Sequence, residues 1–307
     1  MSMLIVFQQM VLIFILMMMG YVLAKKNILS VDGTQQLSWI VVNICNPALV
    51  VYSAFDENAT ATNREVLFMI LIAGISFLVL IIIGNFMGAI LRVPKDERKF
   101  YNLLTVFGNT GFIGIPVVSA VVGTGALIYV AVYNMMFNLI VYTYGIVVLT
   151  KGEEDIHTGS IWKKIFSWGT ISGVLAIVLF MSRVKVPTMV IDLFTYMGRP
   201  TTFLSMVVLG ASMAKVKWSE IFQGKQNFIF SAIRLLVIPI ATAFITKPLI
   251  ANQEIRMVIV LLTAMPMANM PLMLATQYGM NTTKITRVIV LTTILSLFTI
   301  TITAAFV

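Results

Sequence analysis

The stretch FGNTGFIGIPVVSAVVG, Phe107–Gly123, crowds glycines and a proline into the middle of an apolar segment. Proline removes a helical hydrogen bond and clashes with the carbonyl four residues earlier, while glycine tolerates an unwound backbone. We therefore expect a helix that breaks between about Asn109 and Pro116. Because proline suits the first turn of a helix, we expect a second half-helix to start at Pro116.

A second stretch, AMPMANMPLMLATQYG at Ala264–Gly279, has the same character. Pro266 and Pro271 bracket Asn269 within an otherwise apolar run. This pattern predicts a second broken helix, so the chain carries one in each half.

The composition places both stretches in a membrane. Of 307 residues, 59% are apolar and only 11% are charged, and the mean hydropathy is +0.98. A soluble domain has about 25% charged residues, and apolar runs of about 20 residues, long enough to span a bilayer as helices, recur along the chain. A membrane barrel would instead show alternating segments of roughly 10 residues. We expect an all-α polytopic membrane protein.

Ten spans are predicted from the apolar runs. They cover residues 4–24, 34–55, 65–91, 99–122, 126–149, 166–183, 188–214, 226–246, 255–279 and 284–305. The longest polar connection lies between spans 5 and 6, so we expect a first five-helix repeat at 1–150, a cytoplasmic linker at 151–165 and a second repeat at 166–307.

Three proline pairs support an internal repeat. The pairs, separated by 153, 154 and 155 residues, are Pro47 with Pro200, Pro94 with Pro248, and Pro116 with Pro271. An odd number of spans per repeat inverts the second copy, and inverted repeats are typical of secondary transporters. Spans 4 and 9 then run antiparallel, and we expect them to cross at the membrane midplane.

The basic residues predict the orientation. The loops after odd-numbered spans hold 14 Lys and Arg residues, the other loops hold 5, and Arg199 and Arg234 lie inside spans. By the positive-inside rule, both termini of this plasma-membrane protein should face outward. The same charge pattern explains the net charge of +9 without a nucleic-acid partner. One histidine and one cysteine cannot build a metal cluster, and we expect no cofactor.

The crossing of spans 4 and 9 is the predicted substrate site. Each half-helix N-terminus carries about half a positive charge and free N–H groups, which suits a carboxylate. We expect the site to be formed by residues around both breaks: Asn109, Thr110, Gly111, Pro116, Pro266, Asn269 and Pro271. The alternative is a pair of proline-kinked helices that pack closely through glycine.

The motifs GNTGFIGIP and AMPMANMPLMLATQY resemble the paired motifs of the auxin efflux carrier family, which includes plant PIN-type carriers and bacterial carboxylate transporters. NICNPALVVYSAF in span 2 and FLSMVVLGASMA in span 7 are also similar. The resemblance covers essentially the whole chain. The long central loop of the plant carriers is lacking, so malate-like or malonate-like acids are expected ahead of auxin-like acids.

The resemblance implies a scaffold of spans 1, 2, 6 and 7 and a moving transport domain of spans 3–5 and 8–10. It also implies elevator-type alternating access and a homodimer joined through the scaffold. Asn109 matches the position of a substrate-binding asparagine in the plant carriers.

Several polar residues have two interpretations. Asn43 and Asn46 in span 2 either face the substrate or join helices through hydrogen bonds. A polar stripe in span 5 forms either a seam between helices, which we favour, or part of a substrate path. Its residues are Asn134, Asn138 and Tyr142. Gln277 contacts a coupling ion or caps a vestibule. Arg234 reaches the cytoplasm or pairs with substrate, and we give slight preference to a structural role. Arg199 also lies inside a span, and we expect a structural or interface role for it.

Three other functions make different demands on the sequence. A sodium-coupled carrier like the bile-acid symporters would have acidic residues near the crossing, which are lacking in the sequence there. A membrane enzyme would require a nucleophile–base or metal constellation within the bilayer. A non-transporting sensor or scaffold stays open, as do the acid carried, its direction and the coupling ion.

Overall fold

A computed structural model of the protein describes residues 3–55, 61–150, 168–184, 186–214, 218–277, 280 and 283–307. Within these ranges all regular elements are helices, apart from one isolated backbone bridge. The predicted linker at 151–165 lies outside the described residues. The all-helical prediction is therefore confirmed for the described part of the chain.

The first half of the chain contains helices that follow the first five predicted spans. They are α1 (Met3–Lys25), α2 (Val31–Ile40), η1 (Val41–Cys45), α3 (Asn46–Tyr52), α4 (Asn63–Ile90), α5 (Arg98–Val106), η2 (Thr110–Gly114), α6 (Ile115–Val121), η3 (Thr124–Ala126), α7 (Leu127–Ile140), η4 (Val141–Gly145) and α8 (Ile146–Thr150).

The second half follows the other five. Its helices are α10 (Trp168–Ser182), α11 (Thr188–Gly198), α12 (Thr201–Met213), α13 (Trp218–Ile221), α14 (Lys225–Ala232), η5 (Ile233–Val237), α15 (Ile238–Leu249), α16 (Gln253–Ala264), α17 (Met270–Gln277) and α18 (Thr283–Ala304).

Five continuous helical stretches in the described residues are long and apolar enough to cross a membrane. They are Val6–Lys25, Asn63–Ile90, Thr124–Thr150, Lys225–Leu249 and Lys284–Ala304. Shorter apolar helices at Thr110–Val121 and Trp168–Ser182 accompany them. The chain is thus a polytopic membrane protein by its helices, and the inverted ten-span arrangement stays a prediction.

Three of the helices contain a wide π turn directly before a proline. The segments η1, η2 and η5 lead into Pro47, Pro116 and Pro239, each of which occupies the first or second position of the next α-helix. Proline has no N–H to donate and clashes with the carbonyl four residues back, and a π turn shifts that carbonyl out of register. These prolines are therefore accommodated without ending the helix.

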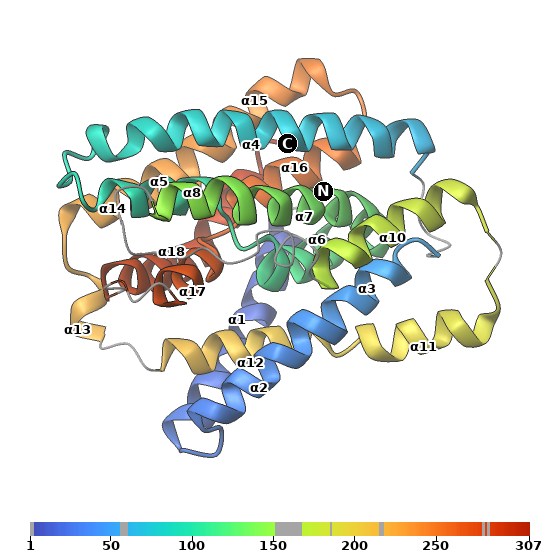
Figure 1. The fold of residues 1–307 in the computed structure, drawn as a ribbon, viewed down its shortest axis with the longest axis horizontal. Coiled ribbons are helices and arrows are strands. Elements are labelled where there is room, and N and C mark those ends of the chain that lie inside the picture. Colours follow the sequence, from blue (N-terminus) through green and yellow to red (C-terminus); the bar gives the residue numbers. More distant parts are fainter. Residues whose placement is uncertain are drawn as a thin grey trace.

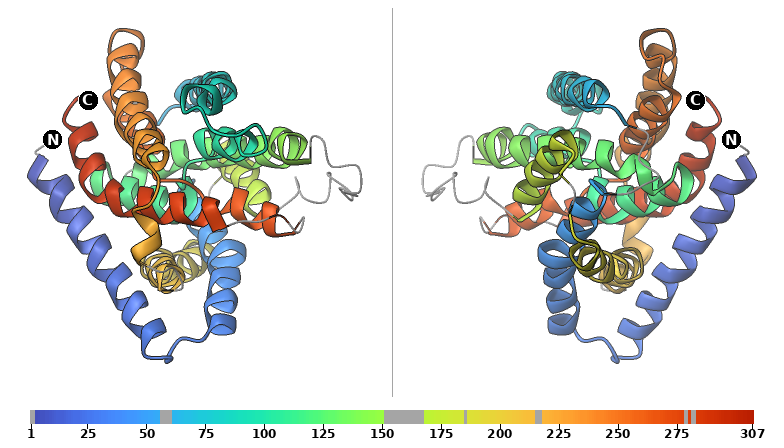
Figure 2. Two further views of the ribbon diagram at one scale, coloured as in Figure 1. Left: turned by 90° about the vertical axis from the view of Figure 1, so that its left-hand side faces the viewer. Right: turned by 90° about the vertical axis from the view of Figure 1, so that its right-hand side faces the viewer.

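One group of helices is centred on the pair α1 and α12. These two pack along each other, α11 and α10 pack on α3, and α2 contacts α12. Gly20 and Gly210 allow the close approach, because a Cβ at Gly210 would lie 1.8 Å from the Met17 carbonyl oxygen. Figure 2 shows α1 and α2 diverging from the turn that joins them. These helices correspond to predicted spans 1, 2, 6 and 7.

The other group surrounds two helices that are buried on all sides. Residues Leu127–Tyr133 of α7 and Met257–Ala264 of α16 are all buried, as expected for helices that are apolar all round. The long helix α4 packs on α5 and α7, and α15 and α18 pack on α16 (Figure 1). These helices correspond to predicted spans 3–5 and 8–10.

Substitution of Gly210 by alanine should separate α1 from α12. The new Cβ would overlap the Met17 carbonyl oxygen at 1.8 Å, and such overpacking costs about 1–3 kcal/mol. We expect a lower midpoint of thermal unfolding for the purified protein in detergent. Gly74→Ala is the matched control, since its Cβ would meet only Met136 Cε at 4.0 Å. Equal midpoints for the two variants would contradict the close packing.

Candidate functional site

The first helix break lies earlier than the sequence predicts. Helix α5 ends at Val106, and Phe107 is extended with φ −103° and ψ 96°. Asn109 then caps the next half-helix, because its side-chain oxygen accepts a hydrogen bond from the Phe112 N–H at 3.1 Å. Pro116 does occupy the second position of α6, but the helical backbone already begins at Thr110, ahead of the expected start. The asparagine cap starts the helix at Thr110, and the π turn η2 carries it through the proline.

The second break follows the same plan. Helix α16 ends at Ala264, Met265 is extended with ψ 143°, and α17 begins at Met270. Pro266 lies inside the break and Pro271 is the second residue of α17. Both spans are broken, as expected.

The two breaks are hydrogen-bonded directly to each other. Gly108 and Met267 form an antiparallel backbone bridge. The Asn109 N–H donates to the Pro266 carbonyl at 2.7 Å, and the Ala268 N–H donates to the Phe107 carbonyl at 3.0 Å. The N-termini of η2 and α17 and the C-termini of α5 and α16 therefore meet at one place.

Arg234 of η5 binds the two C-terminal ends. Its Nε donates to the Thr105 carbonyl at 2.8 Å, and its Nη1 donates to the Thr263 carbonyl. These residues are next to last in α5 and α16, whose final carbonyls lack intrahelical partners. The side chain is only 1% exposed, so it does not extend to the cytoplasm. Arg199, by contrast, follows the last residue of α11 and is exposed on the surface of the single chain, so its expected structural or interface role stays a prediction.

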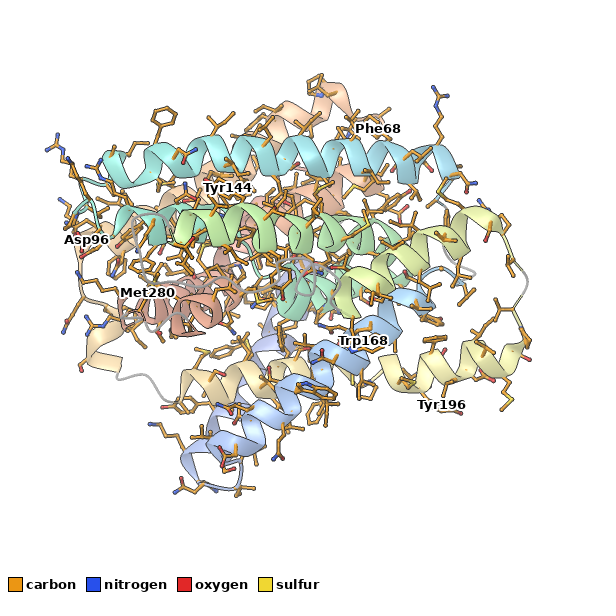
Figure 3. All side chains as sticks on the ribbon, viewed as in Figure 1. Phe68, Asp96, Tyr144, Trp168, Tyr196 and Met280 are labelled. Atoms are coloured by element: carbon orange, nitrogen blue, oxygen red, sulfur yellow. The ribbon has the colours of Figure 1, made fainter. Side chains whose placement is uncertain are left out.

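A cavity of about 230 Å³ adjoins the crossing. Its walls come from η1 and α3, the two breaks with η2, helix α7 with η4, and the start of α10. Trp168 lies at the beginning of α10, near α3 (Figure 3). The lining residues are Val42, Asn43, Asn46, Pro47, Val50, Gly108, Asn109, Thr110, Gly111, Phe112, Ile115, Asn134, Phe137, Asn138, Tyr142, Trp168, Gly169, Ser172, Ala268, Asn269 and Met270.

One residue of the cavity wall carries an unpartnered amide donor. Asn109 is 4% exposed, and its buried Nδ2 has no hydrogen-bond partner among the residues that the structure describes. The buried Oδ1 of Asn46, on the other wall, is also unpartnered. A buried donor without a partner is costly, and a ligand oxygen in the cavity would satisfy it.

The predicted site residues fall into two sets. Those that line the cavity are Asn43, Asn46, Asn109, Thr110, Gly111 and Asn269. The prolines Pro116, Pro266 and Pro271 are not among the lining residues and shape the backbone instead. The side chain of Gln277 lies outside the described residues.

Sequence reasoning missed the aromatic part of the wall. Phe112, Phe137 and Trp168 line the cavity but belong to runs that resemble ordinary apolar helix. The stripe Asn134, Asn138 and Tyr142, for which a helix seam was favoured, also lines it. Asn134 lines the cavity and also joins two helices, because its side-chain oxygen accepts a hydrogen bond from the Thr110 hydroxyl at 2.5 Å. The four-residue spacing of these three polar residues was the signal in the sequence that could have placed them at the cavity.

Comparison with known proteins gives consistent matches. The family described as membrane transport protein matches residues 5–304. An uncharacterized transporter of Methanocaldococcus jannaschii is 27% identical over 94% of both chains. Another, of Methanothermobacter thermautotrophicus, is 24% identical over 93% of both. An uncharacterized transporter of Escherichia coli K12 is 21% identical over 88% of this chain and 87% of its own.

Substitution of Gly108 by alanine should disturb the crossing. The added Cβ would lie 3.0 Å from Arg234 Nη2, and the buried guanidinium cannot move away without lengthening its bonds to Thr105 and Thr263. We expect a loss of stability of about 1–3 kcal/mol, measured by thermal unfolding in detergent. Gly111→Ala is the control, because its nearest new contact is Asn46 Nδ2 at 3.9 Å. A Gly108 variant as stable as the control would contradict this geometry.

Proposed function

The chain belongs to the membrane transport protein family, the auxin efflux carriers, and on that premise we propose that it carries small organic anions across the plasma membrane as a secondary transporter. The family and the relatives are transporters and not enzymes. The observation that carries the proposal is the unpartnered Nδ2 of Asn109, a residue that lines the cavity beside the crossing.

A carboxylate suits this place for electrostatic reasons. The N-termini of η2 and α17 each contribute about half a positive charge, together with N–H groups that lack intrahelical partners. The lining residues include no Asp, Glu, Lys or Arg among the described residues. The amide of Asn109 therefore adds a neutral donor that orients an anion without holding it as tightly as a cation would.

The apolar part of the wall accommodates the body of the substrate. Phe112, Phe137 and Trp168 line the cavity, whose volume is about 230 Å³. A small carboxylic acid, of the malate or malonate kind or with an aromatic ring as in auxin, matches this combination of amides and apolar surface.

The cavity lies between the two helix groups, which supports alternating access of the elevator type. Asn46 and Trp168 come from the group proposed as the scaffold, while Asn109 and Asn269 come from the group proposed to move. The antiparallel bridge between the breaks is also what two inverted repeats would produce. In this proposal the second group carries the anion past the first.

The scaffold is the proposed dimer interface. Helix α11 exposes Met189, Leu193 and Tyr196, and α2 exposes Trp39. Tyr196 projects from the edge of the molecule, away from the transport helices (Figure 3). These apolar faces suit contact with a second copy within the membrane.

A sodium-coupled carrier with acidic ion ligands is less favoured. Such a site would place carboxylates beside the crossing, and the described lining of the cavity holds none. A sensor that does not transport would bind the anion without flux, so the experiment below also separates it from a carrier.

Asn109→Ala should reduce carboxylate flux while the fold persists. The substitution removes the free donor at the cavity and one capping bond, worth about 1 kcal/mol. We expect at least a tenfold lower uptake, about 1.4 kcal/mol, in proteoliposomes tested with a panel of radiolabelled mono- and dicarboxylates, with and without sodium or proton gradients.

Asn63→Ala is the matched control for that experiment. Asn63 also makes one hydrogen bond, from Nδ2 to the Met181 carbonyl at 3.1 Å, and also has one unpartnered buried amide atom, but it is not a lining residue. Its flux should equal that of the wild type. If Asn109→Ala transports normally, or no acid of the panel is carried, the proposed function is overturned.

Fusions at the C-terminus test the proposed orientation. The excess of Lys and Arg in the loops after odd-numbered spans predicts a C-terminus outside the cell. The start of α1 and the end of α18 also lie side by side (Figure 2). A C-terminal alkaline phosphatase should therefore be active, and a C-terminal green fluorescent protein exported in its unfolded form should be dark. The reverse pattern would contradict the orientation.

A further inference from the structure

Four helix ends and one side-chain charge meet at the crossing. The N-termini of η2 and α17 and the C-termini of α5 and α16 contribute partial charges of about +0.5 and −0.5 each, which cancel in total. Arg234 contacts the two negative ends. The net charge of the empty crossing is therefore set by its guanidinium.

Among the described residues, no carboxylate balances the charge of Arg234. The hydrogen bonds of the guanidinium go to the carbonyls of Thr105 and Thr263, which are neutral groups. No carboxylate in the described ranges lies within ion-pair distance of it. A fully buried cation of this kind is costly until an anion approaches.

Arg234 is separated from the cavity by one glycine. Gly108 lines the cavity, and the position of a Cβ on Gly108 lies 3.0 Å from Arg234 Nη2. Only the thickness of this glycine therefore lies between the guanidinium and the residues that line the cavity. In this buried region the attraction is screened much less than in water.

We propose that Arg234 limits the anion site to ligands that carry a single negative charge. The inference rests on the proposed function and adds the charge of the preferred substrate. The site is neutral when it holds one carboxylate, because the positive charge of Arg234 balances it. No further cation would balance the charge of a second carboxylate, because the described lining of the cavity contains no Lys or Arg. Monoanions are therefore the preferred substrates, and diacids bind with one carboxyl protonated.

The test compares acids that share a skeleton and differ in charge. The probes are malonate with its monomethyl ester, and phthalate with its monomethyl ester, at about pH 7.5, where both carboxyls of each diacid are ionised. Binding to the purified protein is measured by calorimetry and by the change in tryptophan fluorescence, to which Trp168 at the cavity contributes. We expect each monoester to bind at least about tenfold more tightly than its diacid.

Two variants separate the charge of Arg234 from its hydrogen bonds. Arg234→Gln retains amide donors but is neutral, and it should weaken monoester binding about tenfold and bring the ratio of monoester to diacid affinity towards one. Arg234→Lys retains the charge and should retain the ratio. A purely structural role would affect the folding of both variants without changing that ratio.

The outcomes distinguish the inference from the proposed function. Diacids that bind the wild type as tightly as the monoesters overturn the inference and leave anion transport standing, and this comparison requires no variant to fold. An unchanged ratio in Arg234→Gln also overturns it. If none of the four acids binds and none is carried in proteoliposomes, the proposed function itself fails.

Discussion

Broken helices in a membrane have backbone groups that lipid cannot satisfy, and here the two breaks satisfy each other. The Asn109 N–H bonds the Pro266 carbonyl, and the Ala268 N–H bonds the Phe107 carbonyl. This exchange fixes where four helix ends meet, and with them the position of the cavity. The rest of the site is arranged around these two hydrogen bonds.

The negative and positive helix ends at the crossing then have different partners. Arg234 occupies the C-terminal ends, so their carbonyls are satisfied, and the N-terminal ends are left for a ligand. Gly108 makes this arrangement compact, because any side chain there would push against the guanidinium. The one buried arginine and the one glycine beside it therefore depend on each other.

The breaks and half of the site were predictable, because proline, glycine and asparagine act through local backbone chemistry. The start of the half-helix at Thr110 was missed because an asparagine cap and a π turn outweighed the proline at 116. The contacts of Arg234 were beyond sequence reasoning, since Thr105 and Thr263 lie 129 and 29 residues away. Trp168 was missed for the same reason, because only the packing of α10 brings it to the cavity.

The bridge between Gly108 and Met267 also has a consequence for biosynthesis. Its two residues are 159 positions apart (267 minus 108), so the first break enters the membrane long before its partner is translated. During that interval its open backbone groups need water, a translocase or neighbouring helices as temporary partners. The last two helices of the chain thus complete the centre of the molecule, and a nascent protein that stalls before α17 would expose an unfinished helix break to quality-control proteases.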